Sequence, residues 1–377
     1  MSNDLSSSPS TGVMVFNTVS LLLWRMSKLV LGLGSVVATL LYFKQDSMLY
    51  FPEIGGIPRR PSQNPRRYRS PSEHQIPFEN HRIECSDGVA IHSWLLLREE
   101  ETEQKSNLPT LIFFHGNAGN IGLRIPNAMQ MLQYLNVNVL MVEYRGYGDS
   151  DSATPNEAGL KLDAEAALKF LAKHPKIDSS KIFAFGRSLG GAVAFHMAEY
   201  AEAQGLPLAG VIVENTFTSI AAMVDHLMPY IAPLKALVLR IGWNSGTIVP
   251  NLELPILFLA GARDQLVPHP HMLELYRSAT RSRLTKMHVV PEGTHNETWM
   301  QGGQDYWDAI RSFLAQVMNS NASPVTPNRV SSSESRAEAT TPGSSIPIMP
   351  SRLLGLARES MRDSNPSLET PGKKELQ

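Results

Sequence analysis

Residues 181–197 read KIFAFGRSLGGAVAFHM. The first five residues form a largely apolar run that is typical of a buried strand, and the alanine-rich stretch after Ser188 predicts a helix. Between them, Gly186, Ser188 and Gly190 make the pattern Gly-x-Ser-x-Gly, which in this context holds a serine on a sharp turn with its hydroxyl clear of the backbone. Ser188 is therefore a candidate nucleophile. A glycine-rich turn of this kind also binds phosphate in some proteins, or only reverses the chain.

Strands and helices alternate on both sides of this turn. An earlier segment, residues 76–98, reads as a β-hairpin that turns at Ser86, Asp87 and Gly88. The expected strands cover residues 110–114, 137–142, 181–185, 208–213, 255–259 and 287–290, and the expected helices cover residues 125–135, 157–172, 189–204 and 306–318. Such alternation implies an α/β fold, in which a mostly parallel central sheet carries helices on both faces.

A serine hydroxyl needs a base before it can attack a carbonyl carbon. Asp264 follows the strand predicted at 255–259, and His295 follows the last strand, so both should lie at the sheet edge that carries Ser188. In that arrangement His295 would take the proton of Ser188, and Asp264 would orient the imidazole. Residues that compete for these roles are the acid Glu214 and the bases His269 and His271.

Attack on a carbonyl builds negative charge on its oxygen, and that charge needs hydrogen-bond donors held in place. The sequence HGNAGN, residues 115–120, follows the strand predicted at 110–114. We expect the backbone N–H groups of Asn117 and Leu189 to be the two oxyanion donors. The same loop also fits a plain strand-to-helix turn, which is compatible with the oxyanion role. The next loop, residues 144–150, is expected to be structural, with aromatic side chains that wall the pocket.

The composition and motifs give no sign of a nucleic-acid partner, a disulfide, a metal or a cofactor. The 377 residues carry a formal net charge of -1, which gives no reason to expect a nucleic-acid partner. Cys85 is the only cysteine, so no internal disulfide can form. No clustered His, Cys, Asp or Glu residues show metal-ligand spacing, and no Walker-type or dinucleotide-binding glycine pattern is present. We therefore expect no metal and no cofactor.

The N-terminal segment, residues 1–50, is apolar. Residues 29–43 carry no charge, and extension back to residue 26 lets Arg25 and Lys28 reach one interface of a bilayer. A membrane anchor at about 26–43 is the leading interpretation. A cleaved signal peptide and a mitochondrial presequence fit less well, because the early N-terminus lacks basic residues and the region is not rich in arginine. Positive charges on the two sides are nearly balanced, so the orientation stays open.

The rest of the chain divides by composition. Residues 51–318 hold the strand–helix alternation and form one domain. Within it, residues 215–254 interrupt the alternation for too long to be a simple loop, and we expect them to cap the carboxyl edge of the sheet. The cap side chains expected to shape a pocket include Met223, Leu227, Tyr230 and Trp243. Residues 319–377 are rich in Ser, Pro and Thr, which is typical of a disordered tail.

Seven short motifs occur in one order within residues 42–313. They are HGNAGN, EYRGYGDS, GRSLGG, ENTFTSI, WNS, GARDQLVP and PEGTHNETW. In this set and order the sequence resembles the membrane-anchored BEM-type α/β hydrolases of fungi and their animal relatives. The resemblance implies the α/β-hydrolase fold, a single membrane pass, and the catalytic-triad positions for Ser188, Asp264 and His295. It also points to lipid chemistry, because related α/β hydrolases remove palmitate from protein cysteines.

These features together predict a membrane-anchored serine hydrolase that cleaves an acyl ester or thioester through an acyl-enzyme intermediate. The resemblance extends this expectation to protein depalmitoylation, with an acyl or lipid-modified substrate and the membrane as partners. We expect a single-pass protein of the endoplasmic reticulum or another endomembrane. The alternatives are a serine peptidase or amide hydrolase, and a non-enzymatic membrane scaffold on the same fold.

Overall fold

An eight-stranded sheet organises the chain, in the order β1-β2-β4-β3-β5-β6-β7-β8. The strands are β1 (Phe78–Glu84), β2 (Ala90–Leu96), β3 (Thr110–Phe114), β4 (Asn138–Val142), β5 (Ile182–Arg187), β6 (Gly210–Glu214), β7 (Ile256–Gly261) and β8 (Thr285–Val290). β1 and β2 pair antiparallel as the predicted hairpin, β2 pairs antiparallel with β4, and the other neighbours are parallel. The predicted mostly parallel sheet is thereby confirmed.

The structure is a computed structural model that describes residues 11–98, 107–230 and 232–322. The tail predicted at 319–377 lies outside the described residues from position 323 onward. Residues 319–322 belong instead to the last helix, α10 (Gly303–Ala322).

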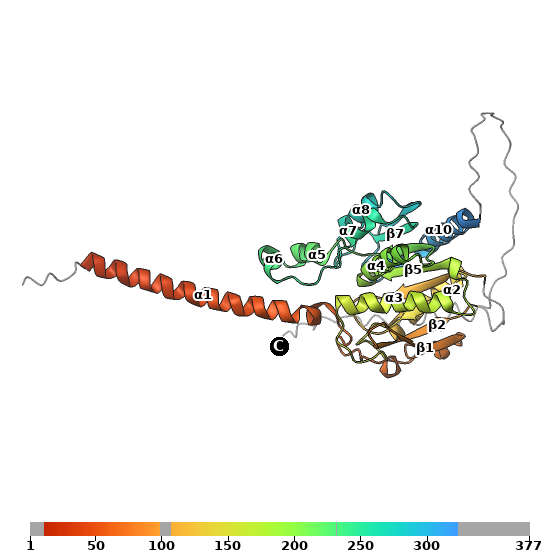
Figure 1. Ribbon diagram of the computed structural model, residues 1–377, viewed down its shortest axis with the longest axis horizontal. Helices are drawn as coiled ribbons and strands as arrows, with labels where there is room; N and C mark the ends of the chain where they lie inside the picture. Colours follow the sequence, from red (N-terminus) through yellow and green to blue (C-terminus); the bar gives the residue numbers. More distant parts are fainter. Residues whose placement is uncertain (1–10, 99–106, 231, 323–377) are drawn as a thin grey trace, which may run out of the picture.

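Helices cover both faces of the sheet (Figure 1). They are α2 (Ile125–Leu135), α3 (Glu157–Lys173), α4 (Leu189–Gln204), α8 (His269–Ser278) and α10. Successive side chains of a strand point to opposite faces, so each strand contributes to two layers. On β3, Ile112 and Phe114 pack into the layer that contains α3, α4 and α8. Leu111 and Phe113 pack into the other layer, with α2 and α10.

Several elements match the sequence prediction to the residue, namely β3, α2 and α4. β5 and β6 run further than predicted, to Arg187 and Glu214. These two buried side chains form an ion pair with each other at 2.9 Å, which allows charged residues to end buried strands. Short helices complete the domain: η1 (Pro61–Gln63), η2 (Pro71–His74), η3 (Ile121–Arg124), η4 (Ser179–Lys181) and α9 (Thr298–Gln301).

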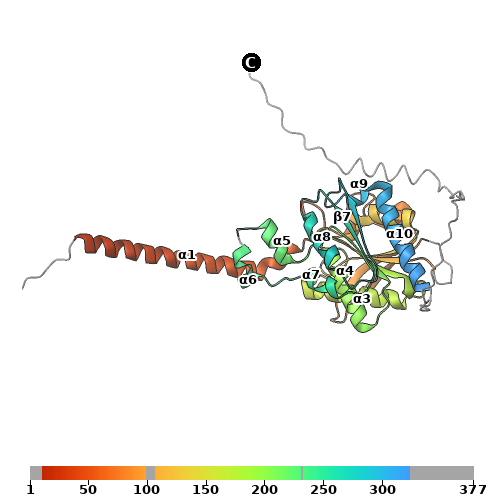
Figure 2. The same cartoon turned by 90° about the horizontal axis from the view of Figure 1, so that it is seen from above.

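A single long helix, α1 (Thr11–Leu49), precedes the domain and projects away from it (Figures 1 and 2). Its 39 residues extend about 58 Å at 1.5 Å per residue. The segment predicted as an anchor, 26–43, lies inside this helix. By length and composition, the part Thr18–Leu49 is able to cross a membrane. Apolar side chains along α1 are exposed, including Leu29, Leu33 and Phe43, so the described part of the protein leaves them uncovered.

The segment between β6 and β7, where a cap is predicted, folds into short helices. They are α5 (Ile220–Leu227), η5 (Ala232–Leu234), α6 (Lys235–Val238), α7 (Ser245–Ile248) and η6 (Val249–Asn251). α5 and α6 lie on the side of the domain from which α1 leaves (Figures 1 and 2), and α6 contacts α1.

The side-chain amide of Gln45 joins α1 to the end of α6. Its oxygen accepts hydrogen bonds from the backbone N–H groups of Arg240 at 2.8 Å and Ile241 at 3.0 Å. Its nitrogen donates to the backbone carbonyls of Tyr42 at 2.8 Å and Val238 at 3.1 Å. A buried amide that uses both of its ends in this way fixes the position of α1 against the cap.

Candidate active site

Ser188 lies at the junction between β5 and α4, at the carboxyl edge of the sheet. Its backbone has φ 54° and ψ -121°, a conformation that residues other than glycine rarely adopt. A Cβ at Gly186 would lie 2.0 Å from the carbonyl oxygen of Gly190, and one at Gly190 would lie 2.1 Å from that of Phe114. Glycines are thus required at both positions, because the start of α4 presses closely against β5 and β3.

The three side chains predicted to act together lie in one hydrogen-bonded line. Nε2 of His295 is 3.0 Å from Oγ of Ser188, and Nδ1 of His295 is 2.7 Å from Oδ2 of Asp264. Because a carboxylate only accepts, Nδ1 carries the proton and Nε2 is free to accept from the Ser188 hydroxyl. Asp264 and His295 reach this line from the loops after β7 and β8. This arrangement is able to remove a proton from the serine hydroxyl.

Asp264 is held by its own loop. Its Oδ1 accepts hydrogen bonds from the backbone N–H groups of Leu266 at 2.9 Å and Val267 at 2.8 Å. The side chain is only 1% exposed. Both carboxylate oxygens are therefore used, one to fix the loop and one to orient His295.

Two of the three competing candidates have other partners. Glu214 pairs with Arg187, and its Oε2 also accepts a hydrogen bond of 2.7 Å from the hydroxyl of Tyr306. His271 lies 3.0 Å from the hydroxyl of Thr218. His269 is the first residue of α8, and its Nδ1 has no hydrogen-bond partner among the described residues. The structure thus brings Asp264 and His295, not these residues, to Ser188.

The loop that contains Asn117 is clamped on several sides. The Asn117 carbonyl accepts hydrogen bonds from the Tyr147 hydroxyl at 2.7 Å and from the backbone N–H of Phe51 at 2.9 Å. The Asn117 side chain donates to the carbonyl of Leu49, at the end of α1, at 2.9 Å. The Tyr144 hydroxyl donates to the carbonyl of His115 at 2.7 Å. The expectation that these tyrosines wall the pocket is wrong, because both are buried behind the loop and support it.

Asn215 is a polar centre that the sequence analysis did not single out. Its Nδ2 lies within hydrogen-bond distance of the carbonyls of Thr294 at 3.2 Å and His295 at 3.1 Å, and of the Thr298 hydroxyl at 2.9 Å. Its Oδ1 accepts a hydrogen bond of 2.8 Å from the backbone N–H of Gly261. Asn215 therefore fixes the loop of His295 against the end of β7, from which the Asp264 loop departs. Its only sequence signal is its place in the ENTFTSI motif.

A buried pair of titratable groups, His115 and Glu143, lies beneath the Asn117 loop. Burial lowers the pKa of His115 to about 3 and raises the pKa of Glu143 to about 8. Nδ1 of His115 donates to the carbonyl of Gly116 at 2.7 Å, and Nε2 faces Glu143 at 3.6 Å. Both side chains are therefore neutral near pH 7. Oε2 of Glu143 accepts a hydrogen bond from the backbone N–H of Ile121 at 3.2 Å, so the pair supports the loop from below.

A cavity of about 310 Å³ opens above Ser188. Its lining joins three parts of the protein: Ser188 with Asn117 and Leu189, the C-terminal end of α1, and the α5–α6 part of the cap. The lining is mostly apolar. Among the described residues that line it, Lys235 is the only one with a charged side chain. The site thus offers a polar reaction centre at the base of an apolar pocket, which is typical of sites that bind apolar ligands.

The cap residues predicted to shape the pocket divide into two pairs. Met223 and Leu227 line the cavity. Tyr230 is 95% exposed at the tip of the cap. Trp243 is buried behind the wall, where its Nε1 donates to the hydroxyl of Tyr50 at 2.9 Å. Trp243 thus supports the cap from behind, and Tyr230 does not line the cavity.

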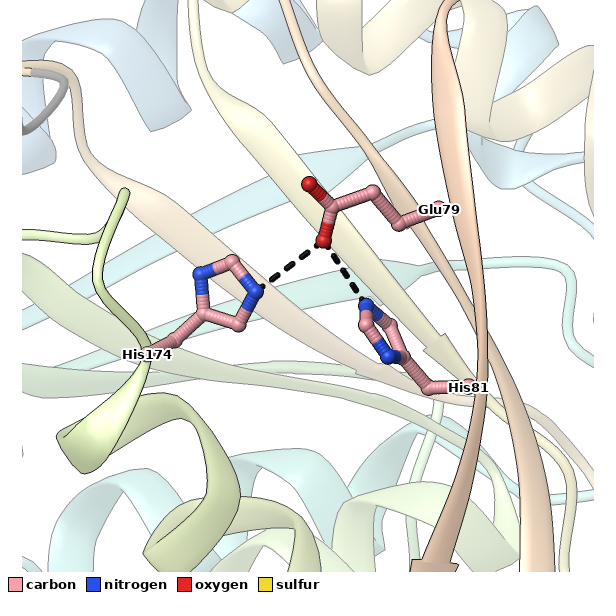
Figure 3. Close-up of side chains that lie close together, drawn as sticks. All are labelled: Glu79, His81 and His174. Atoms are coloured by element: carbon pink, nitrogen blue, oxygen red, sulfur yellow. Dashed lines mark hydrogen bonds and ion pairs between the residues drawn. The ribbon is translucent and has the colours of Figure 1, made fainter. Parts of the chain in front are cut away.

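Three potential metal ligands meet on β1, at the edge of the sheet and four strands from β5 in the sheet order (Figure 3). Glu79 and His81 are two residues apart on the strand, so they project to one side and meet His174 at the end of α3. Oε2 of Glu79 lies 2.8 Å from Nε2 of His81 and 3.0 Å from Nε2 of His174. The sequence analysis missed this cluster because His174 lies far along the chain.

The members of this cluster satisfy one another. Nζ of Lys176 lies 2.9 Å from the other oxygen of Glu79. Burial raises the pKa of Glu79, but hydrogen bonds from Lys176 and His81 outweigh burial and leave that pKa below its usual value. Burial lowers the pKa of His174. With an ammonium group already on the carboxylate, the cluster serves to hold the edge strand β1 to the end of α3.

Several known proteins are similar to this chain in sequence. A family model described as serine aminopeptidase, S33, matches residues 105–254. Protein bem46 of Schizosaccharomyces pombe is 35% identical over 290 residues, which cover 76% of this chain and 92% of that protein. The uncharacterized membrane protein YNL320W of Saccharomyces cerevisiae is 33% identical over 301 residues, which cover 78% of this chain and 99% of that protein.

Solved structures agree on the fold. The esterase Pf2001 of Pyrococcus furiosus superposes with a TM-score of 0.56 at 17% sequence identity, over 71% of this chain and 98% of that one. That likeness shows the α/β-hydrolase fold, whereas the sequence identity to bem46 over nearly its whole length shows the family. The chain belongs to the bem46-type family of α/β hydrolases.

Proposed function

We propose that this protein is a membrane-anchored serine hydrolase that cleaves acyl esters or acyl thioesters. The observation that carries the proposal is the line of hydrogen bonds from Asp264 through His295 to Ser188, which ends at the base of an apolar cavity. Such a line activates a hydroxyl that is otherwise a poor nucleophile.

In the first half of the reaction, Oγ of Ser188 attacks the carbonyl carbon of the substrate, and Nε2 of His295 takes the hydroxyl proton. Negative charge on the carbonyl oxygen is stabilised by the backbone N–H groups of Asn117 and Leu189, both of which line the cavity. Asp264 stabilises the imidazolium that forms. The carbonyl–oxygen or carbonyl–sulfur bond then breaks, and His295 returns the proton to the departing alcohol or thiol.

In the second half, a water molecule attacks the acyl group on Ser188 while His295 takes its proton. The bond to Oγ breaks, His295 gives the proton back to Ser188, and a free carboxylic acid leaves. The balance requires only water as co-substrate. Each of these proton transfers occurs at Nε2 of His295, so the tautomer set by Asp264 serves both halves.

The lining of the cavity supports an acyl chain as the occupant. Apolar side chains from α1, α5 and the segment after α6 surround the space, and burial of apolar surface is favourable by about 25 cal/mol per Å². A fatty acyl ester fits this chemistry, and so does an S-acylated cysteine. Depalmitoylation of proteins is accordingly the reaction that we propose within this class.

α1 supports the membrane anchor. Its exposed apolar side chains need a bilayer or another cover, and a relative that covers most of the chain is named as a membrane protein. A cleaved signal peptide is disfavoured, since Leu41, Gln45, Met48 and Leu49 of α1 line the cavity. The uncharged run 29–43 extends about 22 Å, which suits the thinner bilayer of the endoplasmic reticulum better than the plasma membrane. We therefore include an endomembrane location in the proposal.

An aminopeptidase is the second candidate, because the matching family model carries that description. An aminopeptidase must receive the positively charged N-terminus of a peptide next to its nucleophile, which favours an acidic group in the pocket. Among the described residues of the lining no side chain is acidic, and the one cation, Lys235, forms an ion pair with Asp225. The lack of an acidic group in this lining therefore favours the acyl hydrolase.

Reaction with a fluorophosphonate probe tests the proposal, with the full chain in nanodiscs. We expect labelling of the wild type and its loss in Ser188→Ala, followed by turnover of p-nitrophenyl acyl esters and acyl thioesters. Leucine p-nitroanilide serves as the aminopeptidase substrate in parallel. Absence of labelling in folded wild type would contradict the proposal and favour a non-enzymatic scaffold, and preferential anilide turnover would favour the second candidate.

A further inference from the structure

The C-terminal end of α1 forms one wall of the cavity above Ser188. Four of its residues line the space: Leu41, Gln45, Met48 and Leu49. Their spacing of four, three and one residues places them on one face of a helix. The first and last are about 12 Å apart along the helix axis at 1.5 Å per residue. The helix that leaves the domain is therefore also a continuous wall of the candidate active site.

This wall crosses the level at which α1 would leave a bilayer. Residues 29–43 carry no charge, and Lys44 is the first charged residue after them. A lysine at the end of an apolar span places its ammonium group in the headgroup region. Leu41 then lies on the hydrocarbon side of that level, and Met48 lies on the side of the domain. The cavity that they line thus extends from the reaction centre toward the lipid.

The cap side of the cavity has an exposed apolar tip. Tyr230 is 95% exposed, Leu237 is 79% exposed, and Leu227 and Met228 are 46% and 41% exposed. These residues belong to α5, α6 and the turn between them, on the side of the domain from which α1 projects (Figures 1 and 2). An exposed apolar surface beside an exposed apolar helix is typical of contact with a membrane.

α1 and the cap are held at a fixed distance from each other. Three hydrogen bonds of the Gln45 amide, to Val238, Arg240 and Ile241, and the ion pair between Arg240 and Asp46 join them. Leu40, the neighbour of Leu41 on α1, does not line the cavity and is 56% exposed. A bilayer that surrounds α1 would therefore also lie beside the α5–α6 tip.

We propose that the space between the end of α1 and the α5–α6 cap is an acyl channel that opens sideways into the bilayer. The substrate's acyl chain enters it directly from the leaflet, slides past Leu41 and Met48, and brings its carbonyl to Ser188. The α5–α6 tip lies in the same leaflet and keeps the mouth in contact with lipid. This channel rests on the proposed acyl hydrolase function and defines its substrates as molecules whose chains reside in the membrane.

The first experiment narrows the channel at its membrane end. Leu41→Trp is compared with Leu40→Trp, a matched change on the neighbouring exposed residue, with the full chain in phosphatidylcholine nanodiscs. Turnover of p-nitrophenyl palmitate is divided by that of p-nitrophenyl acetate. We expect Leu41→Trp to lower this ratio about tenfold or more, and Leu40→Trp to leave it within about twofold. Equal ratios in the two variants would overturn the channel.

The second experiment is independent of activity. Cys85 is 4% exposed, so a cysteine placed at Leu237 is the accessible thiol of the described chain for an environment-sensitive dye. Ala315→Cys, on the exposed side of α10, provides the control. In nanodiscs we expect quenching of the Leu237→Cys dye by doxyl-labelled lipid and protection from aqueous iodide, with the reverse at Ala315→Cys. Equal iodide quenching at both positions would refute the placement of the tip.

The two experiments separate the possible failures. Absence of fluorophosphonate labelling and of ester turnover in the wild type, with a lipid-quenched dye at Leu237→Cys, would reject the proposed function but support the orientation of the mouth. Normal turnover with an iodide-quenched dye would retain the hydrolase and reject entry from the bilayer. Labelling of Leu41→Trp by the probe also reports that the variant is folded.

Discussion

The backbone N–H of Ile241, in the cap, donates a hydrogen bond of 3.0 Å to the side-chain oxygen of Gln45, on the long N-terminal helix. A second bond of 2.8 Å comes from Arg240 to the same oxygen. Gln45 is only 9% exposed, so these bonds are largely shielded from water. The candidate active site is therefore formed by two segments, the end of α1 and the cap, that lie almost two hundred residues apart in the chain.

Replacement of Gln45 tests this joint. Gln45→Met keeps the length of the side chain but leaves two N–H groups and two carbonyls without their partner. We expect a loss of unfolding free energy of about 2 kcal/mol or more, since each buried polar group left unsatisfied costs about 1–3 kcal/mol. Thermal unfolding in nanodiscs measures it. Ser47→Ala, an exposed change on the same helix, is the control, and equal unfolding temperatures for the two variants would rule out the joint.

The choice of acid at the site is tested by two amide substitutions. Asp264→Asn removes the charge that orients His295, and we expect kcat to fall by about 10² to 10⁴ with the fold intact. Glu214→Gln leaves Arg187 buried without its ion pair, so we expect a loss of stability of about 3–5 kcal/mol instead. Ester turnover and urea denaturation are measured on both variants. A larger loss of kcat in folded Glu214→Gln than in Asp264→Asn would reverse the assignment.

Asn215 is predicted to position His295 without contact to the substrate. Asn215→Asp keeps the acceptor for Gly261 but removes the donor that faces the carbonyls of Thr294 and His295. We expect kcat to fall about 10- to 100-fold, because a displacement of catalytic groups by about 1 Å has effects of that size. KM for a short ester should change little. Asn251→Asp, at the exposed end of η6, is the matched control, and a rise in KM at constant kcat would argue against a positioning role.

The buried Glu143 predicts a dependence of stability on pH. Its pKa is raised by burial to about 8, whereas in the unfolded chain it lies near 4.5. Between these values the unfolded state has lost the proton that the folded state keeps, so stability falls as pH rises. Glu143→Gln removes this dependence. We expect the stability of the wild type relative to the variant to decline by on the order of 1 kcal/mol per pH unit from about pH 5 to 8, and then to level off.

His115 makes this measurement more specific. Burial lowers its pKa to about 3, so its contribution is complete above about pH 6.5 and is lost as the pH falls toward 3. Wild type and Glu143→Gln should share this acid limb. Chemical denaturation at several pH values separates the two limbs, and identical pH profiles for the two proteins would show that folding does not shift the pKa of Glu143.

Local patterns predicted the fold well because the sheet is buried on both faces. Continuous apolar runs such as residues 110–114 are typical of central strands. The spacing of apolar residues in 125–135 predicts a helix with the same first and last residues as α2. Strand ends were less predictable. Arg187 and Glu214 extend β5 and β6 because each neutralises the other, and that pairing across 27 positions leaves no local trace.

The reaction centre was predictable because of where its residues stand relative to the strands. Ser188, Asp264 and His295 each follow a parallel strand, and parallel strands end at one edge. The residues that support the centre were not predictable. Gln45 and Asn215 act through contacts with distant backbone groups. Tyr147 was expected to line the pocket, but its hydroxyl donates a hydrogen bond to the carbonyl of Asn117 and supports the loop. Such long-range polar contacts depend on the assembled fold and have no periodic signature.

The backbone of Ser188 has a consequence for how this chain can change over generations. A serine held at φ 54° carries strain of about 1–3 kcal/mol, and glycine adopts that conformation without it. Ser188→Gly would therefore abolish the chemistry and make the fold more robust at the same time. Folding stability therefore favours loss of the nucleophile, and only selection for activity opposes it. In a lineage without that selection, Ser188→Gly would yield an inactive protein with the same fold.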